Sequence, residues 1–149
     1  MTKEEGLAWA FQKPPGLAAK LVERAAPHLP PVHIAQLPTD ATSRKAIPIA
    51  TGVLGYFPDA IAAVAEVSRI GNDQHNPGKP LHWRRGASTD HADCAIRHFM
   101  ERGTRDSDGG RHTAKAVWRV LALLQMEIEA ERAGMSYADY IVKVQKEES

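Results

Sequence analysis

The sequence has one cysteine, few aromatic residues and almost no net charge, and no apolar stretch in it is long. A single cysteine, Cys94, excludes an intramolecular disulfide. A net charge of +1 gives no general attraction to the phosphates of nucleic acid, so we expect no stable nucleic-acid complex. No run approaches the roughly 20 apolar residues of a membrane span. The start MTKEEGLAW lacks an apolar run behind a basic segment, so we expect a reduced, cytoplasmic protein.

Proline, by contrast, is abundant at one end of the chain. Seven of the ten prolines lie in the first fifty residues, with room for one short helix over residues 17–26. Proline fixes φ and lacks a backbone donor, so this stretch predicts a proline-rich arm over residues 1–50 that lies on the body or on a neighbouring subunit. A chain of 149 residues is most simply one domain, with its body over residues 51–149.

The body shows the 3.6-residue periodicity of helices and no strand-like alternation. The pattern predicts an all-α bundle of about four helices: one over 58–71, a loop over 72–86, one over 88–102, a longer one that ends at Gly134, and a last one capped by Ser136. The expected inward-facing residues are Ala92, Ala95, Ile96 and Phe99 on the second helix, Val117, Val120, Leu121, Leu124 and Ile128 on the third, and Tyr140, Ile141 and Val144 on the last.

Candidate metal ligands lie on the first two predicted helices. Asp90 and Asp93 are three residues apart and share a helix face, with Arg97 one turn further on. Carboxylate oxygens are ligands that Mg²⁺ prefers, and the alternative is an acidic first turn that complements the helix dipole. Glu66 lies in the apolar run AIAAVAEVSRI and faces either solvent or a cleft shared with the second helix.

Candidate substrate contacts lie in the loop and on the third helix. His112, Lys115 and Arg119 share one stripe that predicts phosphate or base contacts; the alternative is a solvated Lys115 and a packing or capping His112. Amides, an imidazole, a cation and an indole in the loop form a set suited to a nucleobase, although each amide alone is more typical of a group that satisfies loop backbone. This set comprises Asn72, Gln74, His75, Asn76, Lys79 and Trp83.

Several other site classes are disfavoured. DSDGG, residues 106–110, lacks the remaining oxygen positions of an EF-hand loop. A zinc site is disfavoured because there is one cysteine and no closely spaced histidine motif such as HExxH. His91 is followed by alanine, so the His-Asp dipeptide of HD-type phosphohydrolases is absent.

Five separated blocks together resemble a known family. The blocks are RKAIPIATGVLGYFP, GNDQHNPGKPLHW, STDHADCAIRH, DSDGGRH and AVWRVLALLQ. With these blocks, over residues 44–129, the chain resembles phage dATP/dGTP diphosphohydrolases, and it is distantly similar to the all-α, MazG-like nucleotide pyrophosphohydrolases.

The resemblance implies that a deoxypurine triphosphate, dGTP or dATP, is hydrolysed to the monophosphate and pyrophosphate. It implies Mg²⁺, replaceable by Mn²⁺, on Glu66, Asp90 and Asp93, although Ala63 stands where the wider family's pattern has another acid. The cations expected to stabilise the departing pyrophosphate are Arg97, Lys115 and Arg119. The expected proton carrier is either His98 or His112.

The resemblance also implies a biological setting. A phage enzyme of this kind remodels the nucleotide pool in the host cytoplasm, for example for 2-aminoadenine DNA. We expect this chain to form a dimer or tetramer, because four short helices make a thin core and the related families are oligomeric. The alternative to an enzyme is a helical phage protein that binds nucleic acid or a protein partner without catalysis.

Overall fold

The computed structural model describes residues 36–149, which lie in the compact unit Ala35–Ser149. The helix expected over residues 17–26 and most of the predicted proline-rich arm lie outside the described residues. The fold below is that of residues 36–149 alone.

These residues form helices of several lengths and no strand, so the all-α prediction is confirmed for this part of the chain. Arg105 and Arg111 make an isolated bridge across a turn. Within the described range no single helix is long and apolar enough to cross a bilayer, although Ala41–Leu54 and Pro58–His75 together reach that length and composition with an 86° bend.

The elements are α3 Ala41–Lys45, the π-helical turn η2 Ile49–Leu54, α4 Pro58–His75, the 3₁₀ turn η3 Arg85–Ala87, α5 His91–Met100, α6 His112–Arg132 and α7 Tyr137–Glu147.

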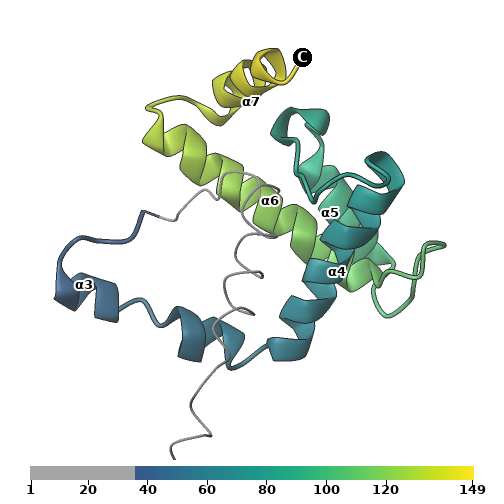
Figure 1. Ribbon diagram of the computed structural model, residues 1–149, viewed down its shortest axis with the longest axis horizontal. Helices are drawn as coiled ribbons and strands as arrows, with labels where there is room; N and C mark the ends of the chain where they lie inside the picture. The colour runs from purple at the N-terminus through teal and green to yellow at the C-terminus, as the bar shows by residue number, and fades with distance from the viewer. Residues whose placement is uncertain (1–35) are drawn as a thin grey trace, which may run out of the picture. The chain divides into compact units, whose positions relative to one another are not determined.

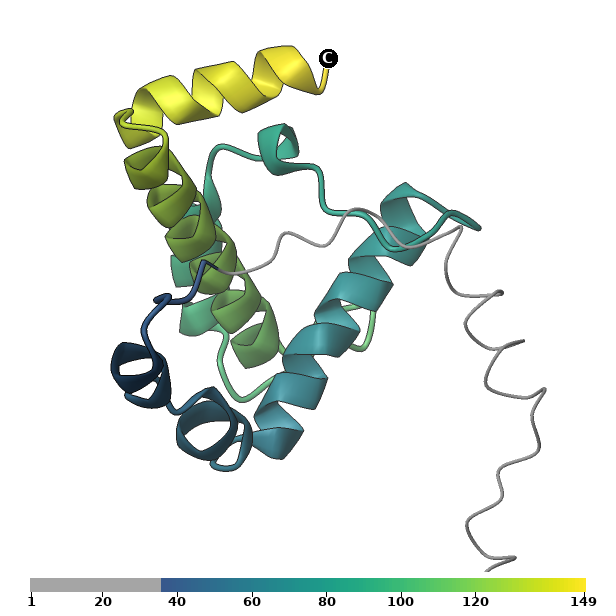
Figure 2. The same cartoon turned by 60° about the vertical axis from the view of Figure 1, so that its left-hand side comes forward.

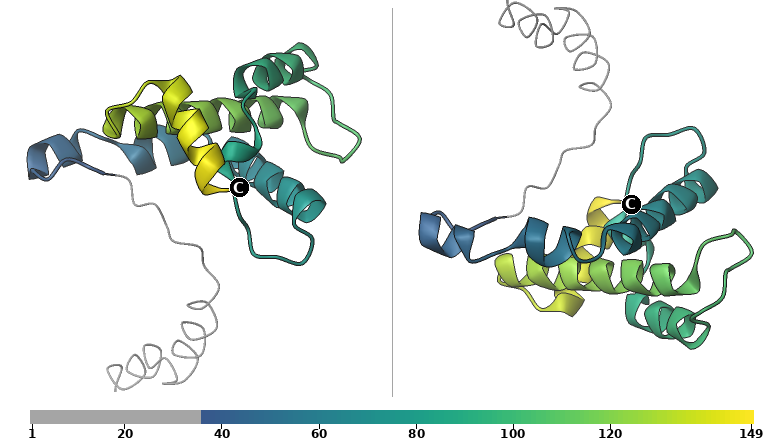
Figure 3. Two further views of the ribbon diagram at one scale, coloured as in Figure 1. Left: turned by 90° about the horizontal axis from the view of Figure 1, so that it is seen from above. Right: turned by 90° about the horizontal axis from the view of Figure 1, so that it is seen from below.

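Helix α6 is the element on which the others are assembled (Figures 1 and 2). Helix α5 packs along its first half as an antiparallel partner, joined to it by the loop over residues 101–111. Helix α4 also packs on α6, and Figure 3 shows α4 and α5 on different sides of it. Helix α7 packs against both α6 and η3. The polar segments of the body therefore gather around the first half of α6.

The first long helix extends further than its sequence predicts. Helix α4 continues through Gly71 to His75, because one helical glycine is unfavourable by only about 1 kcal/mol. In the last turn Asn72 donates from Nδ2 to the Lys79 carbonyl (3.0 Å) and accepts from the His82 amide (3.2 Å). These two bonds fold the following loop back on the helix. The sequence had predicted Asn72, Gln74 and His75 to lie in the loop, but all three belong to α4.

The end of the chain follows the prediction closely. Helix α6 ends at Arg132, and Gly134 has a φ of +65°, a left-handed conformation that favours glycine. Ser136 then caps α7 by accepting from the Asp139 amide at 3.1 Å. The predicted inward face of α7 is confirmed, and the core cluster comprises Met126, Ala130, Tyr140, Ile141 and Val144.

The predicted apolar faces of α5 and α6 are largely wrong for this unit. Of the four residues predicted to face inward on α5, only Ala95 is buried, whereas Ala92 is exposed and Ile96 and Phe99 are 61% and 54% exposed. On α6 the stripe of Val117, Val120, Leu121 and Leu124 is exposed, while Ile128 is half-buried. The inner faces carry small and polar side chains instead, among them Ala114, Ala116, Ala122, His91 and His112. Periodicity identified an apolar face but not the neighbour that covers it.

Candidate active site

The interface between α5 and α6 carries histidines and an arginine where a bundle usually places apolar side chains. His91 and His98 are seven residues apart on α5, and His112 and Arg119 are seven apart on α6, so the antiparallel helices pair them crosswise. His91 Nδ1 lies 3.2 Å from Arg119 Nη1, and the Nδ1 atoms of His98 and His112 lie 3.0 Å apart. His91 and His112 are only 2% and 7% exposed.

A chain of polar contacts surrounds the start of α5. Arg119 Nη1 donates to Ser88 Oγ at 3.0 Å, and that hydroxyl donates to Asp90 Oδ1 at 2.7 Å. Arg97 Nη2 donates to Asp90 Oδ2 at 3.0 Å. The hydrogen bonds from Ser88, Cys94 and Arg97 hold the pKa of Asp90 well below its usual range. Asp90 is therefore an anion that is paired directly with Arg97 and linked to Arg119 through the Ser88 hydroxyl.

His91, which the sequence analysis did not select, completes this part of the interface. Arg119 can only donate, so Nδ1 of His91 is the acceptor and its Nε2 carries the proton. That buried Nε2 has no hydrogen-bond partner among the described residues. Burial, and then the charge of Arg119, lower the pKa of His91, so the ring is neutral. The seven-residue spacing of His91 and His98 is the sequence signal for their shared face.

The other predicted metal ligands, Asp93 and Glu66, are both exposed. Asp93 lies in the first turn of α5 and makes no hydrogen bond within residues 36–149. Glu66 lies on α4, where Arg69 approaches it at 3.5 Å. Within the described part of one chain, ligand atoms of Glu66, Asp90 and Asp93 do not meet within 4.8 Å, and the single set of three that does is His98, Asp106 and His112.

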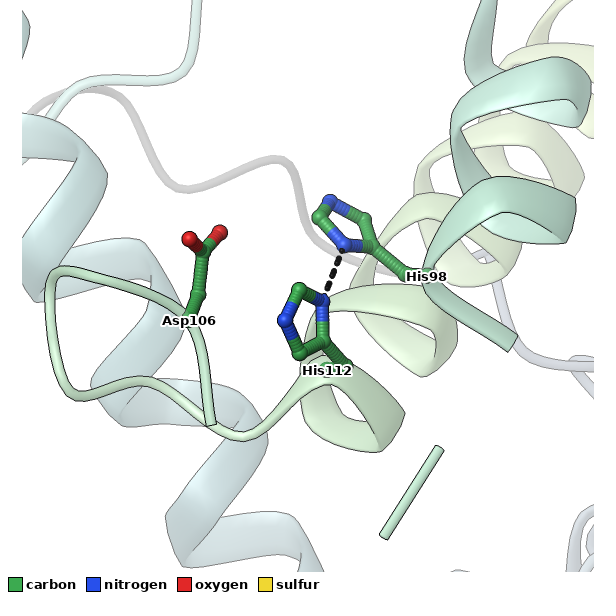
Figure 4. A group of neighbouring side chains, drawn as sticks. All are labelled: His98, Asp106 and His112. Atoms are coloured by element: carbon green, nitrogen blue, oxygen red, sulfur yellow. Dashed lines mark hydrogen bonds between the residues drawn. The ribbon is translucent and has the colours of Figure 1, made fainter. Parts of the chain in front are cut away.

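The loop over residues 101–111 brings acids to the His98–His112 pair (Figure 4). Lys115 Nζ donates at 2.6 Å to both Asp106 Oδ2 and Asp108 Oδ2. These contacts lower the pKa of both carboxyl groups, and Lys115 is half-buried between them. Burial, and then His112 and Lys115, lower the pKa of His98. Lys115, predicted to contact phosphate, is thus engaged with two carboxylates of the loop.

Three of the six predicted base-pocket residues in the loop have side-chain partners within the fold. Asn72 hydrogen-bonds to backbone groups of the loop, which is the alternative role that the sequence analysis gave to each amide. Gln74 Nε2 donates to Asp108 Oδ2 at 3.1 Å. Trp83 packs edge-on against Trp118 at 5.9 Å and has the Arg85 guanidinium 4.5 Å from its centre. The remaining three lie at the end of α4 and in the turn that follows it. His75 and Lys79 are exposed, and Asn76 is half-buried.

A buried ion pair that the sequence analysis missed ties η3 and α7 to α6. Arg85 donates from Nε and Nη2 to the two carboxylate oxygens of Glu129 at 2.7 and 2.8 Å. Gln125 Nε2 donates to the same carboxylate at 2.8 Å, and Tyr140 OH at 2.7 Å. Burial raises the pKa of Glu129, but the bonds from Arg85, Gln125 and Tyr140 outweigh it and lower that pKa to about 2. Burial and the bond to Glu129 raise the pKa of Tyr140 to about 12.

Comparison with known proteins assigns the chain to a family. The family model described as "dATP/dGTP diphosphohydrolase, N-terminal" matches residues 38–136, a range that contains α4, α5, α6 and the residues of the α5–α6 interface. No curated protein and no solved structure matches the chain, so the similarity to MazG-like enzymes stays a prediction. Since the family model covers well over half of the sequence, the chain belongs to the dATP/dGTP diphosphohydrolase family and is a nucleoside triphosphate pyrophosphohydrolase.

Proposed function

We propose that this chain hydrolyses a deoxypurine nucleoside triphosphate, dGTP foremost, to the monophosphate and pyrophosphate, with Mg²⁺ and with the start of α5 as its phosphate site. The family supports the class of reaction. The observation that carries the site is the polar chain Arg119–Ser88–Asp90–Arg97 beside the exposed Asp93. This arrangement places two carboxylates and two guanidinium groups at one helix end.

The donor set at this helix end fits Mg²⁺. The ion takes oxygen ligands and is usually held by one or two carboxylates together with phosphate oxygens of the substrate. Asp90 stays ionised at any physiological pH because its pKa is strongly lowered. Its Oδ1 accepts one bond, from Ser88, and keeps a free lone pair, while Asp93 makes no hydrogen bond within residues 36–149. Mg²⁺ bound there would neutralise the phosphate tail and polarise its P–O bonds.

The helix end itself supports phosphate binding. The first backbone bond within α5 runs from the Cys94 amide to the Asp90 carbonyl at 2.9 Å, and Asp90 provides no side-chain cap. The amides of the first turn are therefore directed out of the helix end, where they favour an anion. Two carboxylates at the same place would repel phosphate unless a cation lay between them, so the phosphate site and the cation site depend on each other.

In the proposed reaction the oxygen of water bonds to phosphorus, the P–O bond to the departing pyrophosphate breaks, and the proton of the water is released to solvent. Arg97 is paired with Asp90 at 3.0 Å. Once that carboxylate binds the cation, we expect the Arg97 guanidinium to stabilise the negative charge that develops on the leaving pyrophosphate. Arg119 positions Ser88 and keeps His91 neutral. Glu66 lies on α4, which packs on a different side of α6, so the proposal rests on Asp90 and Asp93 alone.

Product analysis tests the reaction directly. The full chain is incubated with dGTP and Mg²⁺ and the products are separated, with an EDTA-treated sample as control. We expect dGMP and pyrophosphate. These products would exclude a reaction that removes only the terminal phosphate. Comparison of the four dNTPs with ATP and GTP then ranks bases and sugars. Absence of turnover for every dNTP with Mg²⁺ or Mn²⁺ would contradict the proposal and favour a non-catalytic binding protein.

The exposed apolar stripe of α6 predicts a homo-oligomer, a dimer or a tetramer. Val117, Val120, Leu121 and Leu124 are each between 42% and 51% exposed and form one continuous face. Light scattering is expected to give a mass of two or four chains, and Leu121→Glu with Leu124→Glu is expected to reduce it to one. Val142→Glu, an equally exposed site on α7, is the matched control. A wild-type monomer would contradict this prediction.

A further inference from the structure

Two histidine rings meet at the closed end of the α5–α6 hairpin with their Nδ1 atoms 3.0 Å apart. His98 lies near the end of α5 and His112 is the first residue of α6. Figure 4 shows the rings facing each other with the Asp106 carboxylate beside them, and the three residues offer ligand atoms that all lie within 4.8 Å of one another. The proposed phosphate site at Asp90 and Asp93 uses none of these three side chains.

The spacing of the donors fits a transition-metal ion. Two nitrogens that each lie about 2.0–2.1 Å from one Zn²⁺ are about 3.3 Å apart at a tetrahedral angle and about 2.9 Å at a right angle. The observed 3.0 Å lies between these values. A fourth donor is available nearby: Glu101 Oε2 lies 3.2 Å from His112 Nδ1, outside the set of three, and its 61% exposed side chain has to turn towards the ion to bind it. Two imidazoles and two carboxylates are a donor set that favours Zn²⁺ and similar ions over Mg²⁺.

The charges around the rings also favour a cation. Three carboxylates, those of Glu101, Asp106 and Asp108, stand against two cations, Lys115 and Arg119, so the cluster is net negative with neutral rings. Lys115 occupies one acceptor position of Asp106 Oδ2, and Ser107 bonds to Oδ1. A position on Oδ2 is left for an ion, and Lys115 orients the carboxylate as outer hydrogen-bond partners orient metal ligands.

We propose that His98, His112 and Asp106, with Glu101 as fourth ligand, bind one Zn²⁺-like transition-metal ion that joins the 101–111 loop to the α5–α6 hairpin. The sequence disfavoured zinc because it contains no short histidine motif. The fold supplies the site in another way, since the loop brings together ligands 14 and 8 residues apart in sequence. This site is separate from the Mg²⁺ site proposed at Asp90 and Asp93 and does not rest on it.

Metal titration without nucleotide tests the site. The EDTA-treated full chain is titrated with Zn²⁺ in excess Mg²⁺ by calorimetry, and with Co²⁺ by visible absorption. We expect one ion per chain, and His98→Ala and His112→Ala are each expected to weaken binding about 10-fold or more. His82→Ala, which removes an exposed histidine outside the cluster, is the matched control and should bind as the wild type does.

Two further variants keep the test decisive. His112 is buried, so should His112→Ala fail to fold, Asp106→Asn in the loop provides an independent ligand change with the same expected loss. Asp93→Asn should retain full Zn²⁺ binding, which separates failure of this site from failure of the proposed hydrolysis. Absence of Zn²⁺ and Co²⁺ binding by the wild type, or binding that His98→Ala leaves unchanged, would overturn the proposal.

Discussion

Replacement of Asp93 by asparagine is expected to lower the turnover of dGTP by at least about 10²–10³-fold, the range typical of losing one electrostatic contact to a transition state. Asparagine preserves the size of the side chain and removes its charge, so a cation bridging Asp90, Asp93 and phosphate loses half of its carboxylate ligands. Turnover is measured at saturating dGTP and Mg²⁺, with far-UV circular dichroism and thermal unfolding of the same sample.

The fold should tolerate this change. Asp93 is exposed and makes no hydrogen bond within residues 36–149, so the expected loss of stability is the weaker helix-dipole interaction, about 0.3–1 kcal/mol. Asp73→Asn is a matched control, because Asp73 is an exposed aspartate paired with Arg69 on α4. Activity in Asp93→Asn close to that of Asp73→Asn would show that the proposed metal site is wrong.

The sequence predicted the helical class and several helix ends because those depend on local chemistry. Gly134 and Ser136 end one helix and start the next through backbone conformation and one capping bond, both properties of neighbouring residues. Gly71 was wrongly predicted to end the helix, because the two hydrogen bonds that hold the loop against the last turn of α4 join the Asn72 side chain to backbone groups 7 and 10 positions later. The apolar stripes were assigned inward because periodicity alone does not reveal whether a partner segment or a second chain covers a face.

The candidate site was predictable only where its members share a helix. Asp90, Asp93 and Arg97 follow from helical spacing, and the structure adds the Asp90–Arg97 pair at 3.0 Å. The contact between His98 and His112 depends on how the hairpin closes, and that between Arg85 and Glu129 joins residues 44 positions apart. No local pattern encodes such contacts, so pairs of this kind emerge only from tertiary packing.

Replacement of Glu129 by alanine is expected to destabilise the fold by about 3–5 kcal/mol, because it leaves the guanidinium of Arg85 buried without its partner. The side chains of Arg85 and Glu129 are only 17% and 13% exposed. Tyr140 and Gln125 lose their acceptor in the same step. A domain of this size is stable by only about 5–15 kcal/mol, so the thermal midpoint should fall by about 10–25 °C. Calorimetry or urea unfolding measures the change.

The matched control for this prediction is Glu127→Ala, an exposed glutamate two positions earlier on α6, with an expected change within about 0.5 kcal/mol. Arg85→Met combined with Glu129→Leu removes both charges and should recover most of the loss, because an apolar pair of similar volume avoids burying an unpaired ion. Equal thermal midpoints for the wild type and Glu129→Ala would show that the ion pair contributes nothing.

Acid should narrow the difference between the wild type and Glu129→Ala. The pKa of Glu129 is lowered from 4.5 to about 2 in the folded state, so its contribution is complete above the higher value and is lost as the pH falls towards the lower one. Unfolding free energies compared from neutral pH down through this interval should therefore converge. Glu129→Ala has no carboxyl at this position, so its own acid sensitivity reports the remaining groups, and a gap that stayed constant would place the stabilisation in packing and not in charge.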